Sequence, residues 1–322
     1  MSENALRDKL QELKGIAAES NVDISREIAE LERKLGAPQP PVNEAWRRVE
    51  LARHPDRPTT LQYAQKIFDD FVELHGDRTF GDDPAMVGGI GLLNGVPITF
   101  FGHQKGQNMK DNLKRNFGMA HPEGYRKALR LAHQAAKFNR PILTFIDTPG
   151  AYPGVSGEDR GISQAIALNM KEFSILPVPI IATILGEGGS GGAIGIGVAD
   201  IVLMMENAYY SVITPEGCAS ILLRDSSKAR EAAALLKLTP SDLLRFRVVD
   251  RIVQEPQGGA HMSPDQAAAA LKADLLISLH VLSRRSVESL LAQRHQKFLS
   301  LGVFQEEEAH RKSLLQRLRD FF

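Results

Sequence analysis

The chain has 322 residues, of which 43% are hydrophobic, and its 39 Lys plus Arg equal its 39 Asp plus Glu. This length and apolar content allow a full hydrophobic core, and the balanced charge gives no support for a nucleic-acid or membrane partner. A single cysteine, Cys218, excludes an internal disulfide or a cysteine-based metal cluster and favours a reducing compartment. No apolar run approaches the roughly 20 residues of a membrane span, so we expect a cytoplasmic globular protein.

Residues 1–41 are predicted to form a helical arm that ends in a linker. Leucine and isoleucine recur there at three- and four-residue spacing, Gly36 ends the pattern, and "GAPQPPVN" has no periodicity. Residues 42–260 are predicted to form the main domain, and residues 261–322 a helical C-terminal segment. That segment opens with a predicted capping box, in which Ser263 is the cap, proline takes the first helical position and Gln266 completes the box.

The main domain alternates apolar strands with helices, which indicates an α/β fold. Two apolar runs around Asn94-Gly95 predict a hairpin within residues 85–106. Two strand–loop–helix units follow, beginning with "RPILTFIDTPGAYPG" and "VPIIATILGEGGSGG". Further strands are predicted at "IVLMM", "YYSVI" and "VVDRIV". Uniformly apolar strands are typical of a sheet that is covered on both faces. A basic amphipathic helix near residues 125–138 is predicted to present one apolar face: Ala128, Leu131, Ala132, Ala135 and Phe138.

The segment "GEGGSGGAIGIG", residues 186–197, contains seven glycines in twelve positions and fits three known patterns. Gly186, Gly188 and Gly191 match the dinucleotide-binding fingerprint, with Glu206 at the spacing of a ribose-binding carboxylate. However, "GVAD" leaves barely two helical turns before the next strand, which argues against a complete βαβ unit.

The second pattern is the nucleophile elbow, with Ser190 between Gly188 and Gly192. It would require a carboxylate and a histidine, for which Asp200 or Asp250 with His261 are the candidates. The flanking glycines are expected to give Ser190 more freedom than a strained elbow requires, so we expect no hydrolase.

The third pattern is an oxyanion hole formed by backbone N–H groups at the start of a helix. Glycines allow a ligand to approach the backbone closely, and the helix dipole favours negative charge there. Close helix–sheet packing alone is the structural alternative, but it does not require so many glycines.

"DTPGAYPG", "GEGGSGGA", "SVITPEGCASIL" and "KRNFGMAHPEGYRKALRL" closely resemble the alpha subunit of the bacterial acetyl-CoA carboxylase carboxyltransferase, from about Leu51 to Ala260. The resemblance implies a crotonase (ClpP-like) superhelix of β-β-α units with helical N- and C-terminal extensions. It also implies transfer of a carboxyl group from carboxybiotin, carried on a separate biotin carboxyl carrier protein, to acetyl-CoA, which gives malonyl-CoA for fatty acid biosynthesis. Gly195 and Ala199 depart from the family pattern, where we expect alanine and glycine, so Gly195→Ala is expected to be nearly silent.

By this resemblance, the backbone N–H groups of Gly191, Gly192 and Ala193 form the oxyanion hole for the ureido oxygen of biotin. Gly150 and Ala151, in the paired loop, are expected to add a second wall. On this view carboxybiotin releases CO2 and the biotin anion takes the proton from the acetyl group, so the protein need not supply a general base.

Nine Lys and Arg residues lie between Lys105 and Arg140, against two acidic residues. Such a run usually forms a solvated face. The competing interpretation is that Lys105, Lys114 or Arg115 neutralises the phosphates of CoA.

The chain lacks a biotin attachment sequence, a nucleotide-binding P-loop and the clustered cysteines of a zinc ribbon, so no metal is expected on it. The resemblance therefore implies a half-site that requires a zinc-ribbon beta subunit in an alpha2beta2 heterotetramer, together with the carrier protein and biotin carboxylase. Two alternatives remain: a crotonase-type acyl-CoA hydratase or isomerase, with Glu187 and Glu216 as acid and base, and a non-catalytic scaffold.

Overall fold

The computed structural model describes residue 11 and residues 43–302. Apart from that single position, the predicted arm of residues 1–41 lies outside the described residues, as does the end of the predicted C-terminal segment. From Glu44 onward, the described residues belong to one compact unit.

The helices and strands of this unit follow one another along the chain in a mixed α/β order. They are α3 (Glu44–Ala52), α4 (Thr60–Ile67), β1 (Asp70–Glu73), β2 (Met86–Leu93), β3 (Val96–His103), α5 (Met109–Lys114), η1 (Asn116–Gly118), α6 (Pro122–Lys137), β4 (Ile142–Thr148), α7 (Val155–Asp159), α8 (Ile162–Ile175), β5 (Ile180–Gly189), α9 (Ser190–Ile194), β6 (Ile201–Met205), β7 (Tyr209–Ser211), α10 (Pro215–Cys218), η2 (Ala219–Leu223), η3 (Ser226–Lys228), α11 (Ala229–Leu235), α12 (Pro240–Arg245), β8 (Arg251–Val253), α13 (Pro264–Leu282) and α14 (Val287–Leu299).

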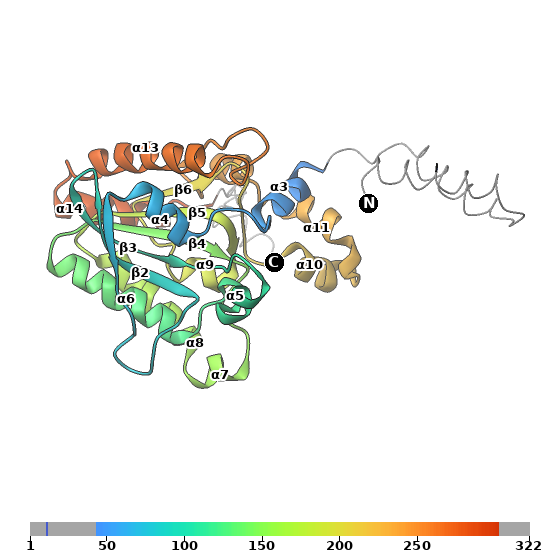
Figure 1. Ribbon diagram of the computed structural model, residues 1–322, viewed down its shortest axis with the longest axis horizontal. Coiled ribbons are helices and arrows are strands. Elements are labelled where there is room, and N and C mark those ends of the chain that lie inside the picture. Colours follow the sequence, from blue (N-terminus) through green and yellow to red (C-terminus); the bar gives the residue numbers. More distant parts are fainter. Residues whose placement is uncertain (1–10, 12–42, 303–322) are drawn as a thin grey trace, which may run out of the picture. The chain divides into compact units, whose positions relative to one another are not determined.

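The strands form one sheet in the order β1-β2-β3-β4-β5-β6-β8, with β7 paired to the end of β5. The first three strands are antiparallel, and from β3 onward neighbouring strands are parallel. Figure 1 shows α13 on one side of the sheet and α6 and α8 on the other. Every residue of β4 and β5 is buried, which confirms that these strands are covered on both faces.

The hairpin between β2 and β3 is confirmed. Leu93 pairs with Val96, and both residues of the turn have positive φ, 49° at Asn94 and 75° at Gly95. Positive φ at both positions is the requirement of a type I′ turn, which explains the Asn-Gly pair.

The predicted apolar face of α6 is correct except at its end. Ala128, Leu131, Ala132 and Ala135 are fully buried, but Phe138 is 56% exposed. The helix ends at Lys137, so Phe138 lies beyond its last turn, and its ring contacts the Arg140 guanidinium instead of the core.

The C-terminal segment begins its helix at Pro264, as predicted, and α14 follows after a short break. The predicted capping box is wrong, because the Ser263 side chain makes no capping hydrogen bond. Cys218 is a free, buried cysteine, as expected for a small apolar side chain.

Candidate active site

Two loops meet at the edge of the sheet where the parallel strands β4 and β5 end. Thr148 of β4 pairs with Gly188 of β5, so the loop after β4 lies beside the start of α9. A Cβ atom on Gly192 would lie 2.5 Å from the carbonyl carbon of Gly150 and 2.6 Å from the amide nitrogen of Ala151. Backbone therefore packs directly on backbone, and only glycine fits at position 192 without a shift of the loop.

The first turn of α9 contains the N–H groups of Gly191, Gly192 and Ala193. An α-helix leaves its first N–H groups without partners in the helix, and Gly189 at the N-cap has no side chain to bind them. A Cβ atom on Gly191 would meet one atom within 4 Å, Cδ1 of Ile166 at 3.7 Å, so this residue borders open space. The helix start can therefore receive a ligand atom that carries partial negative charge.

The structure argues against dinucleotide binding by the glycine segment. Gly186 and Gly188 are residues of β5 and do not form a turn after it. A Cβ atom on Gly186 would lie 2.7 Å from Oδ1 of Asp147, so this glycine serves packing. Glu206 accepts a hydrogen bond from the backbone N–H of Glu255 and is committed within the chain.

Ser190 adopts a left-handed backbone conformation, with φ of 48°. Our expectation that neighbouring glycines leave it conformationally free is therefore wrong, since it occupies a conformation that few non-glycine residues adopt. No catalytic triad forms, however, and the Ser190 hydroxyl has no hydrogen bond to another described residue. The candidate partners are engaged elsewhere: Asp200 binds Arg294, Asp250 binds Lys297, and His261 stacks on His54.

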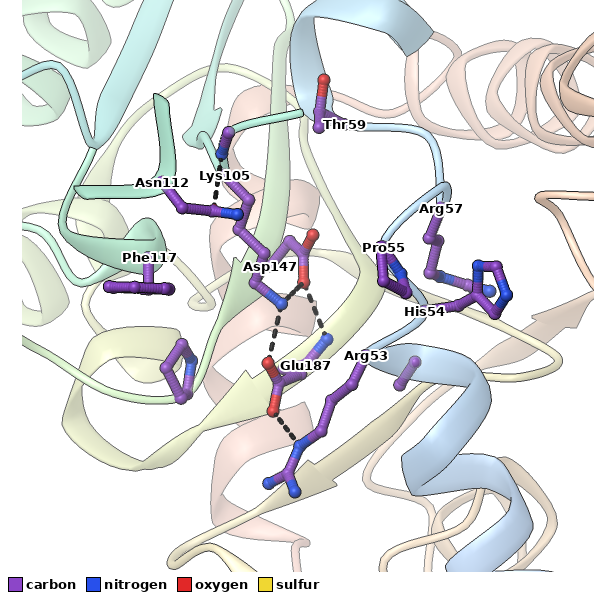
Figure 2. A pocket seen from close by; sticks show the side chains of 13 residues that line it. Arg53, His54, Pro55, Arg57, Thr59, Lys105, Asn112, Phe117, Asp147 and Glu187 are labelled. Atoms are coloured by element: carbon purple, nitrogen blue, oxygen red, sulfur yellow. Dashed lines mark hydrogen bonds and ion pairs between the residues drawn. The ribbon is translucent and has the colours of Figure 1, made fainter. Parts of the chain in front are cut away.

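A polar cavity of about 290 Å³ lies beside the same two loops (Figure 2). Inside it, Nζ of Lys105 lies 2.8 Å from Oδ1 of Asp147 and 2.7 Å from Oε1 of Glu187. Nε of Arg53 lies 2.7 Å from the other oxygen of Glu187. Each of these charges is thus opposed by a charge of the same chain.

Glu187 and Glu216 are both held in the ionised state. Burial alone would raise the pKa of Glu187, but the charges of Lys105 and Arg53 outweigh it and lower this pKa to about 2. The hydroxyl of Tyr209 also donates a 2.6 Å hydrogen bond to Glu187. Burial likewise opposes the shift at Glu216, where hydrogen bonds from Arg53 lower the pKa. Near neutral pH neither carboxyl group carries a proton to donate as a general acid, and pairing with Arg53 and Lys105 weakens Glu187 as a proton acceptor.

The basic residues between Lys105 and Arg140 do not form one solvated face. Lys127 is almost completely buried and pairs with Asp82. Arg115 binds Asp111 at 3.1 Å, whereas Lys114 is exposed and has no ion pair with another described residue. The three residues suggested for CoA phosphates therefore differ, since Lys105 is internal, Arg115 is partly engaged and Lys114 is free to contact a ligand.

A second cavity, of about 390 Å³, borders the first turn of α9. None of the described residues that line it carries a charge: Ser190, Gly191, Ile194, Tyr210, Ser211, Val212, Leu243 and Val248. Sequence reasoning missed this cavity, because β7 and α12 contribute to it from positions distant in the chain. It also missed Arg53, Asp147 and Tyr209 of the polar cavity, although Asp147 lies within the conspicuous segment "DTPGAYPG".

Among the described residues, no group of three His, Cys, Asp or Glu side chains could hold a metal ion. Within residue 11 and residues 43–302, no helix has the length and apolar character of a membrane span.

Comparison with known proteins gives consistent results at the level of sequence. Residues 2–302 match the family model described as acetyl co-enzyme A carboxylase carboxyltransferase-like. A Treponema denticola protein named acetyl-coenzyme A carboxylase carboxyl transferase subunit alpha is 55% identical over 306 residues, which cover 95% of this chain and 100% of the relative. Proteins of the same name from Thermus thermophilus and Staphylococcus haemolyticus are 54% and 51% identical, over 92% and 94% of this chain and 96% and 97% of theirs.

Solved structures support the fold. Transcarboxylase 12S aligns with a TM-score of 0.57 and 19% identity, over 77% of this chain and 43% of that chain. A Pseudomonas malonate decarboxylase hetero-tetramer in complex with coenzyme A aligns with a TM-score of 0.56 and 17% identity, over 75% of this chain and 91% of that chain. Both alignments support the predicted crotonase fold, which is confirmed.

Proposed function

Because this chain belongs to the family of acetyl-coenzyme A carboxylase carboxyl transferase alpha subunits, we propose that its glycine loop forms the biotin half of the carboxyl-transfer site. The family reaction transfers a carboxyl group to acetyl-CoA and gives malonyl-CoA. The observation that carries the proposal is the start of α9, where Ser190 is exposed and Gly191 is partly exposed, bordered by a cavity whose described lining residues carry no charge.

The residues at this place fit a neutral ring system such as that of biotin. A Cβ atom on Gly150 would have no neighbour within 4 Å, and Gly191 has similar room, so a ligand can approach the backbone at both residues. The apolar side chains of Ile194 and Val212 suit the hydrophobic part of such a ring.

When bound, carboxybiotin supplies the carboxyl group that is transferred. The N–H groups of Gly191, Gly192 and Ala193 would donate hydrogen bonds to its ureido oxygen and would stabilise negative charge there. Gly150 and Ala151 form the opposite wall. Donors that are already oriented toward a developing charge lower the barrier, and one such donor typically contributes about 100- to 1000-fold in rate.

The remaining parts of the reaction come from partners. The zinc-ribbon beta subunit would hold acetyl-CoA and stabilise its enolate, and the biotin carboxyl carrier protein would deliver the biotin that biotin carboxylase has loaded. An alpha2beta2 heterotetramer is the assembly we expect. This division fits the state of Glu187 and Glu216, because both carboxylates are already paired with Arg53.

Lys114 and Arg115 are better candidates than Lys105 for binding the phosphates of CoA. Lys114 is exposed at the end of α5, and Arg115 follows it directly. Lys105 already opposes two buried carboxylates, so contact with phosphate would require it to leave them.

Gly191→Val tests the proposed biotin site. Gly192→Val is not a clean test, because its side chain would collide with the backbone at Gly150 instead of filling the ligand space. At position 191 the valine methyl groups enter open space beside the N–H groups. We expect a loss of at least about 100-fold in carboxyl transfer by the complex with the beta subunit, on the scale of one lost oxyanion donor.

The matched control is Gly81→Val, because a Cβ atom on Gly81 would have no neighbour within 4 Å and Gly81 lies far along the chain from both loops. This variant should keep normal activity. If Gly191→Val assembles with the beta subunit and transfers carboxyl groups at the normal rate, the loop does not line the biotin site.

A further inference from the structure

Helix α9 is too short and too rich in glycine to be stable without contacts to the rest of the chain. It has five residues, two of them glycine, and isolated helices shorter than about 12 residues are marginal in water. Each interior glycine costs roughly 1 kcal/mol relative to alanine in a helix. Other parts of the molecule must therefore fix the direction of its N–H groups.

The carbonyl groups of α9 and the turn after it divide into two sets. Those of Gly191, Ala193 and Ile194 accept hydrogen bonds from backbone N–H groups three or four residues further along. The carbonyls of Gly192, Gly195 and Ile196 do not take part in these bonds, and each accepts one from a side chain instead.

Three buried side chains supply these bonds, and we call them the α9 clamp. The Tyr125 hydroxyl of α6 donates to the Gly192 carbonyl at 3.2 Å. The Asn169 amide of α8 donates to Gly195 at 3.0 Å, and the Thr144 hydroxyl of β4 donates to Ile196 at 2.9 Å. All three clamp residues have 0% exposure, so water does not compete for their donors.

The clamp is also linked internally. The Asn169 amide donates a second 3.0 Å bond to the Tyr125 carbonyl, which ties α8 to α6. The ring of Tyr125 lies against Gly195, where a Cβ atom would come within 2.6 Å of the ring. The absence of a side chain at Gly195 thus lets the Tyr125 hydroxyl reach Gly192.

We propose that Tyr125, Thr144 and Asn169 are positioning residues for carboxyl transfer, because they fix the orientation of the first-turn N–H groups of α9. This inference rests on the proposed function of the glycine loop. Stabilisation of a developing charge depends on donors that are oriented before the reaction, so a loosened α9 should slow the chemical step and leave acetyl-CoA binding unchanged.

The chain offers a matched control for two of the clamp residues. Tyr63 and Thr183 are also fully buried, and their hydroxyl groups have no hydrogen-bond partner among the described residues. Tyr125→Phe and Tyr63→Phe therefore remove the same atom from equally buried rings. Thr144→Val and Thr183→Val form a second pair, on neighbouring strands of the sheet.

The experiment measures two quantities in the complex with the beta subunit. One is kcat and KM for acetyl-CoA, and the other is hydrogen exchange of the amides of residues 190–196. We expect Tyr125→Phe and Thr144→Val each to lower kcat roughly three- to tenfold, the scale of one buried hydrogen bond, with KM unchanged and faster exchange at α9. Tyr63→Phe and Thr183→Val should change neither quantity.

Each other outcome overturns a specific part of the inference. Unchanged exchange at α9 would show that the clamp does not fix the helix. Faster exchange with normal kcat would leave the clamp intact as a structural device but would refute the role of α9 in carboxyl transfer. Equal losses of kcat in the Tyr63 and Thr183 variants would show a general effect of buried hydroxyl removal.

Discussion

At the scale of single residues, ion pairs determine the protonation state of the buried carboxyl group of Glu187 in the polar cavity. Glu187 keeps its charge although its side chain is only 8% exposed, because Lys105 and Arg53 each contact one of its oxygens at 2.7 Å. Tyr209 adds a third donor to the same carboxylate. Breaking such a buried pair leaves unmatched charges, which costs more than the pair itself contributes.

Glu187→Gln is therefore expected to lower the free energy of unfolding by about 3 kcal/mol or more at pH 7. The pKa of Glu187 in the folded chain is about 2, below its value in an unfolded chain. A lowered pKa stabilises the fold above the unfolded value, near 4.3, and the contribution disappears as pH falls toward 2. Urea unfolding at several pH values should thus show wild type and variant converging between about pH 4 and pH 2.

The control for this measurement is Glu158→Gln, which removes a charge from an exposed side chain that has no ion pair with a described residue. It should leave the free energy of unfolding nearly unchanged at every pH. A Glu187→Gln variant as stable as wild type at pH 7 would show that the pairs in the cavity contribute little to the fold.

At the scale of elements, α9 shows where sequence patterns mislead. The family pattern suggested that alanine at position 195 is harmless. In the structure, its Cβ atom would lie 2.6 and 2.8 Å from two carbons of the Tyr125 ring. That ring is fully buried, so it cannot move aside into solvent.

We therefore expect Gly195→Ala to lower stability by about 1–3 kcal/mol, the usual cost of forcing extra volume into a packed core. Thermal unfolding measures this directly, with Gly81→Ala as the comparison because that position is open. Equal melting temperatures for the two variants would mean that Tyr125 can shift at little cost, and the original expectation from the sequence would stand.

The elements themselves were largely predictable, since their signals are local. The Asn94-Gly95 turn, the buried stripe of α6 and the apolar strands β4 and β5 all follow from spacing over a few residues. The errors concern the ends of helices. Phe138 continues the apolar spacing of α6 in the sequence but lies after its last turn. Ser263 occupies the N-cap position of α13, but its side chain makes no capping hydrogen bond. Element ends depend on tertiary packing, which a local pattern does not contain.

At the scale of the whole molecule, the site depends on contacts between distant segments. Arg53 and Glu187 are 134 residues apart, and Tyr125 and Gly192 are 67 apart. The glycine loop could be recognised from its letters, because the ligand approach and the helix start are local properties. The clamp and the polar cavity could not, because nothing in the sequence states which buried donor meets which carbonyl.

We predict that the isolated chain has no carboxyl-transfer activity. In the proposed site this chain supplies the N–H donors for one oxyanion only, so the enolate must be stabilised by the partner subunit. Malonyl-CoA formation should appear only when the chain is mixed with a matching beta subunit and carboxylated carrier.

Omission of each component in turn is the control. Full activity without the beta subunit would contradict the division into two half-sites. Hydration of a crotonyl thioester by the chain alone would instead return the hydratase interpretation, which the pairing of Glu187 with Lys105 and Arg53 disfavours.

The backbone contact between α9 and the loop after β4 has a consequence for how this gene can vary. Every single-base change in a glycine codon that alters the amino acid introduces a Cβ atom. At position 192 that atom strikes the Gly150 peptide, whereas at positions 150 and 191 it enters open space. Substitutions at position 192 should therefore deplete the folded protein itself, while those at 150 and 191 should leave its abundance intact and remove only its activity. A mutational scan scored separately for abundance and for growth would divide neighbouring glycines of one short segment into two classes, constrained by two different selective pressures.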